Sequence, residues 1–328
     1  MYKADKNRYD AMQYNSCPNG LALPKISLGL WQNFGKDADY DEIRDIVLTA
    51  FDNGITHFDL ANNYGPDPGD AEINFGKIFA ENLKPYRDEL IISTKAGYEM
   101  WDGPYGGRGG TRKYLIASLD QSLKRMGLDY VDIFYHHCMT PETPLKETAL
   151  CMSDIVRQGK ALYIGMSNYD GKHMHKMHHK CDDYNVPFII NQNRYSIFDR
   201  TVEHNELKKE CKSKKKALIA FSPLAQGQLS DKFIKGVPEN SRLYGRENYW
   251  AHVGLNEERL NQIKLLGKLA NERGETLSQL AIQWLLQQGV TSVLVGVRTK
   301  QQLLENLAAL EKPPLTEEEL VYIRKITS

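Results

Sequence analysis

Several features are scarce or absent in this sequence of 328 residues. Its five cysteines include no C-x-x-C pair, so neither a disulfide framework nor a zinc knuckle is indicated, and a reducing cytoplasm is expected. No apolar run approaches the roughly 18 residues of a membrane span, and the charged start MYKADKNRYD lacks the apolar stretch of a signal peptide. Lys plus Arg and Asp plus Glu number 42 each, so no excess charge attracts nucleic acid or a membrane.

The dinucleotide-binding fingerprint G-x-G-x-x-G is also missing. The only G-x-G is Gly107-Arg108-Gly109, which lies in a loop and has Arg112 where the third glycine would stand. A doubly wound dinucleotide-binding fold is therefore disfavoured.

What the chain does contain is eight repeats of a short apolar run followed by an amphipathic run. The expected strands cover residues 28–31, 56–61, 89–97, 130–137, 161–168, 187–192, 217–223 and 291–296. The expected helices cover residues 40–54, 70–82, 111–127, 145–159, 169–184, 202–214, 256–274 and 299–310. Short, continuously apolar strands are typical of a parallel sheet covered on both faces. Eight such units predict an α/β fold of the closed (β/α)8 TIM-barrel type.

Three further segments are added to this repeat. Residues 12–26 contain an Asn19-Gly20 turn and predict a β-hairpin that closes the bottom of the barrel. Residues 277–289 and 316–328 predict extra helices towards the C-terminus. No Ser/Pro-rich linker divides the chain, so a single domain over residues 1–328 is expected.

The polar residues at the strand ends form a chemically consistent set, because the loops after the strands converge on one face of such a barrel. Asp59, Lys95 and His137 end the second, third and fourth strands, and Tyr64 follows Asp59 by five residues. A phenol is a poor acid at neutral pH, and a buried ammonium beside it is expected to lower its pKa. The aspartate would keep that ammonium charged, and the imidazole would orient a carbonyl oxygen. The set predicts a carbonyl-polarising site with Tyr64 as general acid.

A series of segments spans nearly the whole chain: GLW, GITHFDLANNYG, STKAG, YVDIFYHH, GMSNY, NQNRY, FSPLAQGQL and VGVRTKQQLLENL. In sequence and in order these segments resemble those of the aldo-keto reductase superfamily. The stretches around these motifs most resemble the bacterial L-glyceraldehyde 3-phosphate reductase branch, which is itself similar to potassium-channel β subunits. The resemblance implies Tyr64 as proton donor with Lys95 and Asp59 as its tuning pair. The family histidine stands five residues after Asp132 and is therefore His137.

The resemblance further implies a bound NADPH and a small carbonyl substrate. It assigns to the cofactor Trp31, Asp59, Ser167, Asn168, Gln192, Tyr195, Ser222, Leu224, Gln226, Gly227, Lys232, Arg242, Gly296, Arg298, Gln302 and Asn306. Within that set, Tyr195 would stack on the nicotinamide ring. Substrate contacts are expected from Trp31, Tyr64, Tyr98, Trp101 and His137, with simple packing an equal alternative for Trp31, Tyr98 and Trp101. His136 departs from the family pattern and is expected to narrow the pocket.

The preference for NADPH also has a physical basis. Residues 295–306 read as a strand end that enters a helix, with Thr299 as the N-cap. Free backbone N–H groups and the helix dipole favour a phosphate there, and the Arg298 guanidinium adds a bidentate hydrogen-bond donor. The extra 2′-phosphate of NADPH would suit this arrangement.

The proposed reaction is reduction of short aldehydes or ketones, with L-glyceraldehyde 3-phosphate and methylglyoxal as the favoured substrates. The alternatives are a nicotinamide-binding regulatory protein like the channel β subunits and, less favoured, a lyase with a phosphate-bearing cofactor. A homo-oligomer is also implied. Many family members carry a longer tail over the pocket, which leaves the substrate open.

Two other clusters allow more than one interpretation. His175 and His179 lie four residues apart on an expected helix, but no carboxylate or cysteine at ligand spacing was evident, so a solvated face is favoured and no metal is expected. The glycine-rich loop over residues 98–113 carries Arg108 and Arg112, which would either bind a substrate phosphate or be solvated residues of a lid. Thr111 would cap the following helix.

Overall fold

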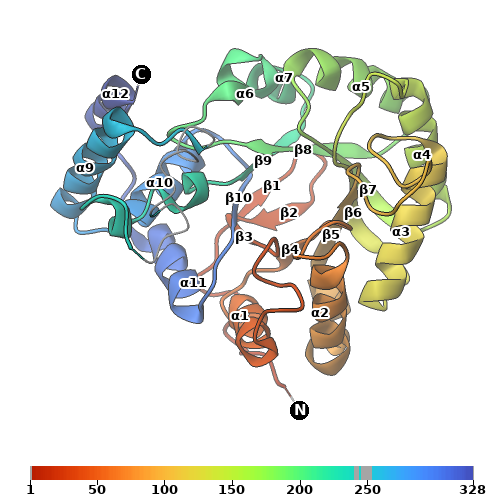
Figure 1. Ribbon diagram of the computed structural model, residues 1–328, viewed down its shortest axis with the longest axis horizontal. Helices are drawn as coiled ribbons and strands as arrows, with labels where there is room; N and C mark the ends of the chain where they lie inside the picture. The colour runs from red at the N-terminus through yellow and green to blue at the C-terminus, as the bar shows by residue number, and fades with distance from the viewer. Residues whose placement is uncertain (1, 240–243, 245–252, 328) are drawn as a thin grey trace.

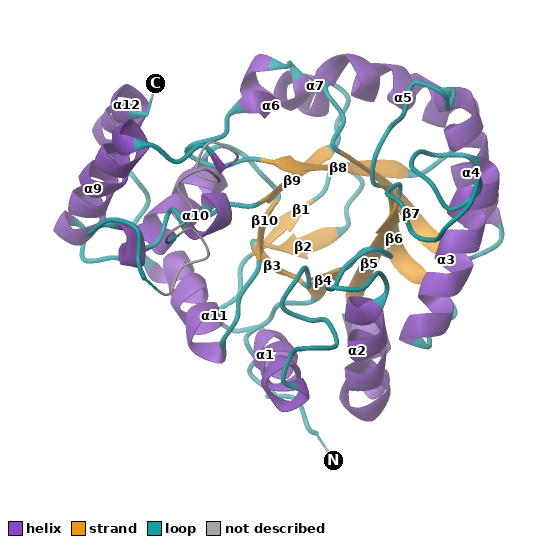
Figure 2. Ribbon diagram, viewed as in Figure 1, coloured by secondary structure: helices purple, strands orange, loops and turns teal. Residues whose placement is uncertain are grey.

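The protein folds as a closed barrel of eight parallel strands (Figures 1 and 2). The computed structural model describes residues 2–239, 244 and 253–327. The barrel strands, in spatial order, are β10 (Ser292–Val295), β3 (Ile26–Gly29), β4 (His57–Asp59), β5 (Ile91–Ala96), β6 (Val131–His136), β7 (Ala161–Ser167), β8 (Phe188–Arg194) and β9 (Ala217–Phe221). All eight predicted strands are present, and the (β/α)8 fold is confirmed.

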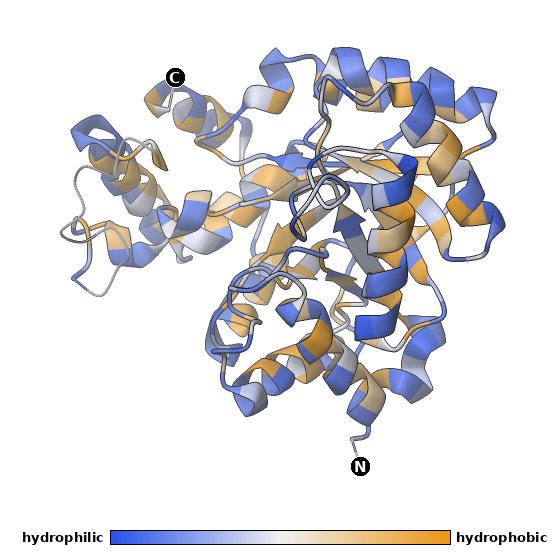
Figure 3. Cartoon of the chain, turned by 45° about the vertical axis from the view of Figure 1, so that its right-hand side comes forward, coloured by the Kyte–Doolittle hydropathy of each residue, from blue (hydrophilic) through white to orange (hydrophobic). Residues whose placement is uncertain are grey.

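Helices surround the barrel, and in Figure 3 hydrophobic and hydrophilic residues alternate along them, as in amphipathic helices. They are α1 (Tyr40–Asp52), α2 (Asp70–Ile78), α3 (Arg112–Met126), α4 (Leu145–Arg157), α5 (Gly171–Asp183), α6 (Thr201–His204), α7 (Leu207–Ser213), α9 (Glu257–Glu272), α10 (Leu277–Gln287), α11 (Lys300–Leu307) and α12 (Glu317–Ile326). Within the described residues, no helix combines the length and apolarity needed to cross a membrane.

The predicted N-terminal hairpin is confirmed as β1 (Tyr14–Ser16) and β2 (Ala22–Pro24). In Figure 2 it lies across the ring of strands. Leu23 packs into the barrel interior with Ile133 and Ile219, which are inward-facing residues of β6 and β9. The hairpin therefore closes the end of the barrel where the strands begin, and it leaves the opposite end for loops.

Of α9 and α10, which precede β10, it is α10 and not α9 that packs on the barrel. The barrel-covering helix was predicted at residues 256–274, with 277–289 as an addition. Instead every residue of α10 from Leu277 to Leu285 is buried, and Trp284 packs on the residue that follows β8. A helix that is buried on all sides lies between two layers of the fold. α10 therefore covers the barrel, and α9 lies outside it beside α12 (Figure 1).

Two predicted helices are shorter than expected. The segment 202–214 divides into α6 and α7 because Glu206 has a left-handed backbone with φ of 65°. The break packs against the start of α5, where a Cβ on Gly171 would lie 2.7 Å from the Asn205 carbonyl oxygen. α2 ends at Ile78 and continues as a π turn and a 3-10 turn to Glu89.

Candidate active site

A buried ammonium joins an aspartate and a tyrosine at the end of the barrel where the strands finish. Lys95 on β5 is fully buried and forms an ion pair with Asp59 on β4. Its Nζ also donates to the Leu60 carbonyl oxygen at 2.7 Å and to the Tyr64 Oη at 3.3 Å. The carboxylate, the ammonium and the phenol predicted from the sequence are thus in one continuous contact.

The local backbone explains why these three groups meet. β4 and β5 are neighbours, with Asp59 paired to Ser93, so Lys95 lies one inward-facing position beyond the aspartate. After β4 the chain turns back, with the Asn62 N–H donating to the Lys95 carbonyl oxygen at 2.9 Å and the Tyr64 N–H to the Ala61 carbonyl oxygen at 3.1 Å. This turn brings the Tyr64 ring over the strand ends.

The acidity of Tyr64 differs from the sequence-based expectation. Burial raises the pKa of Tyr64 well above its usual value, and the negative charge of Asp59 adds to the rise. Burial lowers the pKa of Lys95, against the opposing effect of Asp59. The net shift of the Tyr64 pKa is therefore a rise and not the expected lowering, because the effect of burial is larger than that of Lys95. A phenol with a raised pKa keeps its proton at neutral pH, as a proton donor must, and the Lys95 contact can stabilise the phenolate that forms.

His137 lies beside Tyr64, while His136 points the other way. The His137 ring is 5.9 Å from the Tyr64 ring between centroids. Burial lowers the pKa of His137 well below its usual value, helped by the charge of Lys95, so the imidazole is neutral. His136 is instead buried outside the strands, where its Nδ1 is 2.7 Å from the Tyr169 Oη. The expectation that His136 narrows the pocket is wrong, because successive strand residues face opposite sides of the sheet.

Asp59, Tyr64, Lys95 and His137 are here called the inner set, and a second layer of polar groups lies beneath it. Ser93 Oγ donates to Asp59 Oδ1 at 2.7 Å and lies 3.0 Å from His57 Nε2. His57 Nδ1 is 2.9 Å from Ser27 Oγ, which is 2.6 Å from Ser292 Oγ. This chain of buried groups inside the barrel was missed by sequence reasoning. The available indication was a run of polar residues at inward positions of strands.

The number of protons in this chain constrains His57. The Ser292 hydroxyl donates a hydrogen bond to the Pro24 carbonyl oxygen at 2.6 Å. In the hydrogen bond between Ser292 and Ser27, the Ser27 hydroxyl must therefore be the donor. His57 must then donate a hydrogen bond from Nδ1 to Ser27 Oγ, while the Ser93 hydroxyl donates one to Asp59. The contact between His57 Nε2 and Ser93 is a hydrogen bond only when the ring carries both protons. Burial lowers the pKa of His57 to about 4, so at neutral pH Ser93 has two acceptors for one proton.

Comparison with known proteins agrees with this geometry. Residues 25–328 match the model of the aldo/keto reductase family. The chain belongs to the aldo/keto reductase family. It is 48% identical to an L-glyceraldehyde 3-phosphate reductase of Escherichia coli O157:H7, over 98% of this chain and 94% of that protein. It is 34% identical to a probable voltage-gated potassium channel subunit beta of Arabidopsis thaliana, over 93% of each.

A solved structure shows the same architecture. The chain superposes on a thermostable aldo-keto reductase crystallised with the inhibitor epalrestat with a TM-score of 0.75, at 29% identity, over 96% of this chain and 100% of that one. The suspected family and its barrel are thus confirmed. Aldo-keto reductases are oxidoreductases that generally use nicotinamide cofactors.

The end of β7 and the middle of β8 supply polar groups beside the inner set of this aldo-keto reductase. Ser167 Oγ is buried without a hydrogen-bond partner among the described residues. Asn168 has a left-handed backbone with φ of 59°, and its amide donates to the His137 carbonyl oxygen at 3.1 Å. Gln192 Nε2 donates to Asp59 Oδ1 at 3.0 Å. An orphaned hydroxyl next to two fixed amides fits a ligand with its own amide, as a nicotinamide has.

The loop after β9 has an unusual backbone. Ser222, Ala225, Gln226 and Gly227 all have φ between 46° and 91°, and such runs turn N–H groups towards one side. Leu224 lies within this run, and Lys232 is beside Gly227, where a Cβ would be 3.9 Å from the Lys232 Nζ. The loop fits an anionic group such as a pyrophosphate. Arg242, predicted for the same role, lies outside the described residues.

The turn into α11 is organised as predicted. Thr299 caps α11, its side chain accepting from the Gln302 N–H at 3.3 Å. The Gln302 side chain in turn accepts from the backbone N–H of Arg298 at 2.9 Å. Arg298 itself is exposed. A Cβ on Gly296 would approach nothing closer than 3.9 Å, so a ligand has room there. Asn306, in the last turn of α11, is buried.

Tyr195 does not lie where the predicted stacking role needs it. Its ring is fully buried and packs edge-on against Trp284 of α10, at 5.4 Å between centroids, while its hydroxyl contacts Glu203. That position is outside the barrel, so the assignment is corrected. Phe221, the last residue of β9, instead packs with the inward-facing cluster and is partly exposed. It is the aromatic ring that the strand alternation directs into the barrel mouth.

The aromatic residues predicted for substrate contact differ in position. Trp31 is 51% exposed, with its ring 6.5 Å from that of Tyr64 between centroids. Tyr98 packs edge-on against His137 at 4.7 Å. Trp101 packs instead on Tyr114 of α3 at 5.4 Å, and among the described residues it makes no ring contact with the inner set. Trp31 and Tyr98 border the mouth, whereas Trp101 supports the loop.

The histidine-rich face of α5 contains a carboxylate that the sequence-based argument overlooked. His178, His179 and Asp182 have ligand atoms within 4.8 Å of one another, and His178 Nε2 is 3.3 Å from Asp182 Oδ2. His175 is bound to Glu210 on α7 at 3.0 Å. The statement that no carboxylate lies at ligand spacing is therefore wrong. The group is on an outer helix and shares no contact with the inner set.

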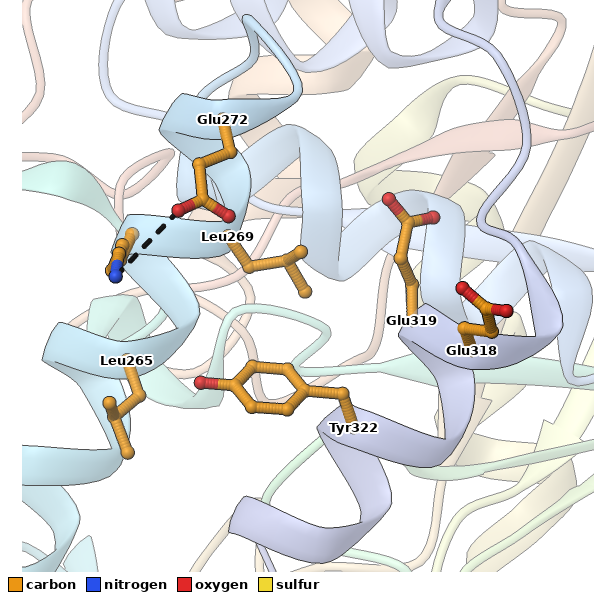
Figure 4. A pocket seen from close by; sticks show the side chains of 7 residues that line it. Leu265, Leu269, Glu272, Glu318, Glu319 and Tyr322 are labelled. Atoms are coloured by element: carbon orange, nitrogen blue, oxygen red, sulfur yellow. Dashed lines mark ion pairs between the residues drawn. The ribbon is translucent and has the colours of Figure 1, made fainter.

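A shallow groove lies between α9 and α12, away from the barrel mouth (Figure 4). It is lined by Leu265, Lys268, Leu269, Glu272, Glu318, Glu319 and Tyr322. None of the inner set lines this groove, so it is not part of the candidate active site.

Proposed function

We propose that this aldo-keto reductase uses NADPH to reduce short aldehydes and ketones to alcohols. L-glyceraldehyde 3-phosphate is the favoured substrate and methylglyoxal the second. The observation that carries the proposal is the contact of the buried Lys95 with both Asp59 and the Tyr64 hydroxyl. The E. coli relative named L-glyceraldehyde 3-phosphate reductase supports the substrate.

Each member of the inner set has one role in this proposal. A nicotinamide cofactor, when bound, supplies the hydride that the carbonyl carbon accepts. Tyr64 protonates the oxygen that becomes negative, and Lys95 stabilises the phenolate left behind. Asp59 holds Lys95 in place and compensates its charge. The neutral His137 donates an N–H to orient the carbonyl oxygen.

Binding of the cofactor is assigned to three segments. Ser167, Asn168 and Gln192 would hold the carboxamide end, the loop from Ser222 to Gly227 with Lys232 the pyrophosphate, and Arg298 the 2′-phosphate. The exposed side chain of Arg298 at a capped helix N-terminus supports NADPH over NADH. The five cysteines are all free, which supports a cytoplasmic protein. A homo-oligomer, as the family resemblance implies, remains part of the proposal.

Steady-state oxidation of NADPH and NADH with a panel of aldehydes tests the function. We expect kcat/KM to be highest with NADPH and L-glyceraldehyde 3-phosphate, with methylglyoxal also reduced. The alternative is a regulatory nicotinamide-binding protein, which the 34% identity to a channel β subunit favours. Tight NADPH binding with no turnover of any aldehyde would support that alternative and contradict the reductase.

A further inference from the structure

Two arginines from separate segments lie at the rim of the barrel mouth, one beside Tyr98 and one beside Phe221. Arg108, in the loop after β5, has its guanidinium carbon 5.1 Å from the centre of the Tyr98 ring and its Nη2 3.2 Å from Cys138 Sγ. Arg194 is the last residue of β8, paired in register with Phe221, and its guanidinium carbon is 6.0 Å from that ring. Both arginine side chains are exposed.

A further observation relates both arginines to the same phenol. Burial raises the pKa of Tyr98, and the positive charges of Arg108 and Arg194 both act against that rise. The strand register agrees with this. Gln192, two residues before Arg194, pairs with Ser167, and the next residue, Asn168, has its Nδ2 3.5 Å from the Tyr98 hydroxyl. Both arginines are therefore near Tyr98. Trp31, Tyr98, Arg108 and Arg194 are here called the rim residues.

Neither rim arginine has a carboxylate partner in the part of the chain that the structure describes. Arg112, the other arginine considered from the sequence, forms an ion pair with Asp154 of α4 at 2.5 Å. It therefore faces the outer helices and not the mouth. Glu99 is an acid whose charge acts on Arg108, and it forms no ion pair with it. Two exposed, unpaired guanidinium groups leave their hydrogen-bond donors for a ligand.

The arginines of the rim are connected to the inner set through the Tyr98 ring. Tyr98 packs against His137 at 4.7 Å, and His137 packs against Tyr64 at 5.9 Å. Asn168 Nδ2 is 3.5 Å from the Tyr98 hydroxyl and adds a second contact to this ring. A small aldehyde with its carbonyl oxygen at Tyr64 and His137 would extend its other end past Tyr98 towards the arginines.

We propose that Arg108 and Arg194 together bind the phosphoryl group of a phosphorylated aldehyde. This inference rests on the proposed reductase function and names the part of the site that selects the substrate. A phosphate monoester carries up to two negative charges and three acceptor oxygens, so two guanidinium groups can each donate a pair of N–H bonds. A substrate without the phosphoryl group gains nothing from these contacts.

The test compares two trioses that differ only in the phosphoryl group. The ratio of kcat/KM for L-glyceraldehyde 3-phosphate over that for L-glyceraldehyde is measured with NADPH for the wild-type enzyme, Arg108→Ala, Arg194→Ala and the matched control Arg112→Ala. We expect each rim variant to lower the ratio about 10- to 100-fold, the range for losing a charge-assisted hydrogen bond. The control is expected to keep the wild-type ratio within about twofold. Retention of NADPH binding shows that each variant is folded, and Arg108→Lys should recover part of the ratio.

The outcomes separate this inference from the function on which it rests. An unchanged ratio in both rim variants, or an equal fall in Arg112→Ala, overturns the phosphate site while the reductase stands. If the wild-type enzyme has nearly equal kcat/KM values for L-glyceraldehyde 3-phosphate and L-glyceraldehyde, the phosphate site is likewise overturned. If the wild-type enzyme reduces no aldehyde with either cofactor, the proposed function itself is wrong.

Discussion

Lys95 and Arg108 come from neighbouring parts of the chain, at the end of β5 and in the loop that follows, yet their surroundings are opposite. The Lys95 ammonium is fully buried and bonded to a carboxylate, a carbonyl oxygen and a phenol. The Arg108 guanidinium is exposed and touches only a thiol and the face of a ring among the described residues. One charge is fixed by the protein, and the other is available to a ligand.

The same contrast extends to the whole inner set and the rim. Inner groups are held by strands and by each other, so their geometry is determined before any substrate arrives. Rim side chains stand on loops and strand ends and are partly or largely exposed. We therefore expect substitutions in the inner set to reduce kcat for every substrate, and substitutions at the rim to change which substrate is preferred.

Removing the inner ammonium should have the largest effect. Lys95→Met deletes the group that stabilises the Tyr64 phenolate, so kcat should fall by about 10²-fold or more, with the residual rate shifted in its pH dependence. A pH–rate profile of each variant measures this. Lys216→Met is the control, because Lys216 is a partly buried lysine, bound to the Phe188 carbonyl oxygen at 2.7 Å and remote from the inner set. Because Met leaves Asp59 unpaired, Asp59→Asn/Lys95→Met checks that the loss is not one of folding. An unaltered profile in Lys95→Met would make this lysine purely structural.

The cofactor preference should change next most strongly. Arg298→Ala should raise the Kd for NADPH about 10- to 100-fold and leave the Kd for NADH nearly unaltered, since only NADPH carries the 2′-phosphate. Fluorescence titration with each cofactor gives the two values. Lys300→Ala is the matched control, because Lys300 lies two residues away and is paired with Asp45 at 3.6 Å. Equal weakening of both cofactors by Arg298→Ala would remove the 2′-phosphate assignment.

The layer beneath the inner set should contribute more modestly. Ser93→Ala removes the hydroxyl that donates to Asp59, so we expect kcat to fall about 10-fold with KM little altered. Ser27→Ala, on the far side of His57, should lower kcat by less than about threefold. If the two variants behave alike, the hydroxyl of Ser93 does not act through Asp59.

The smallest expected effect concerns pH and stability. Burial lowers the pKa of both His57 and His136 to about 4, from a usual value of about 6.5. The unfolded chain then binds more protons between these values, so stability is complete above about pH 6.5 and is lost as pH falls towards 4. We expect roughly 1–2 kcal/mol per histidine between pH 7 and pH 5, from urea unfolding at each pH. His136→Gln should flatten this dependence and the exposed His179→Ala should not; a dependence unaffected by His136→Gln would show that this histidine titrates normally.

Much of the fold and the inner set follows from the sequence, because parallel strand ends must meet at one face. That rule alone predicts that Asp59, Lys95 and His137 lie together. The rule does not predict which side of the sheet a residue near a strand end faces. Gln192 and Tyr195 are three residues apart, so in an extended chain they face opposite sides, and only Gln192 points inward.

The remaining differences depend on tertiary packing that local pattern does not carry. Phe221 faces the same side of β9 as Ile219, and this alternation can be seen in the sequence. The residues that pack against Phe221 inside the barrel cannot be seen there. The sequence predicts the same role for Arg108 and Arg112 in the glycine-rich loop. They differ in the structure because Asp154 on α4 forms an ion pair with Arg112. Thr111 occupies the predicted N-cap position of α3 but makes no side-chain cap hydrogen bond, a geometry that depends on the loop before it.

Single-turnover reduction by Tyr64→Phe tests the central claim most directly. The substitution keeps the ring against His137 and Trp31 and removes only the hydroxyl that contacts Lys95. Stopped-flow measurement of NADPH oxidation at saturating aldehyde, with cofactor affinity measured alongside, separates chemistry from binding. We predict a fall in the rate of reduction of about 10²-fold or more with NADPH affinity retained. A rate close to that of the wild-type enzyme, with the cofactor bound equally well, would contradict the assignment of Tyr64 as the proton donor.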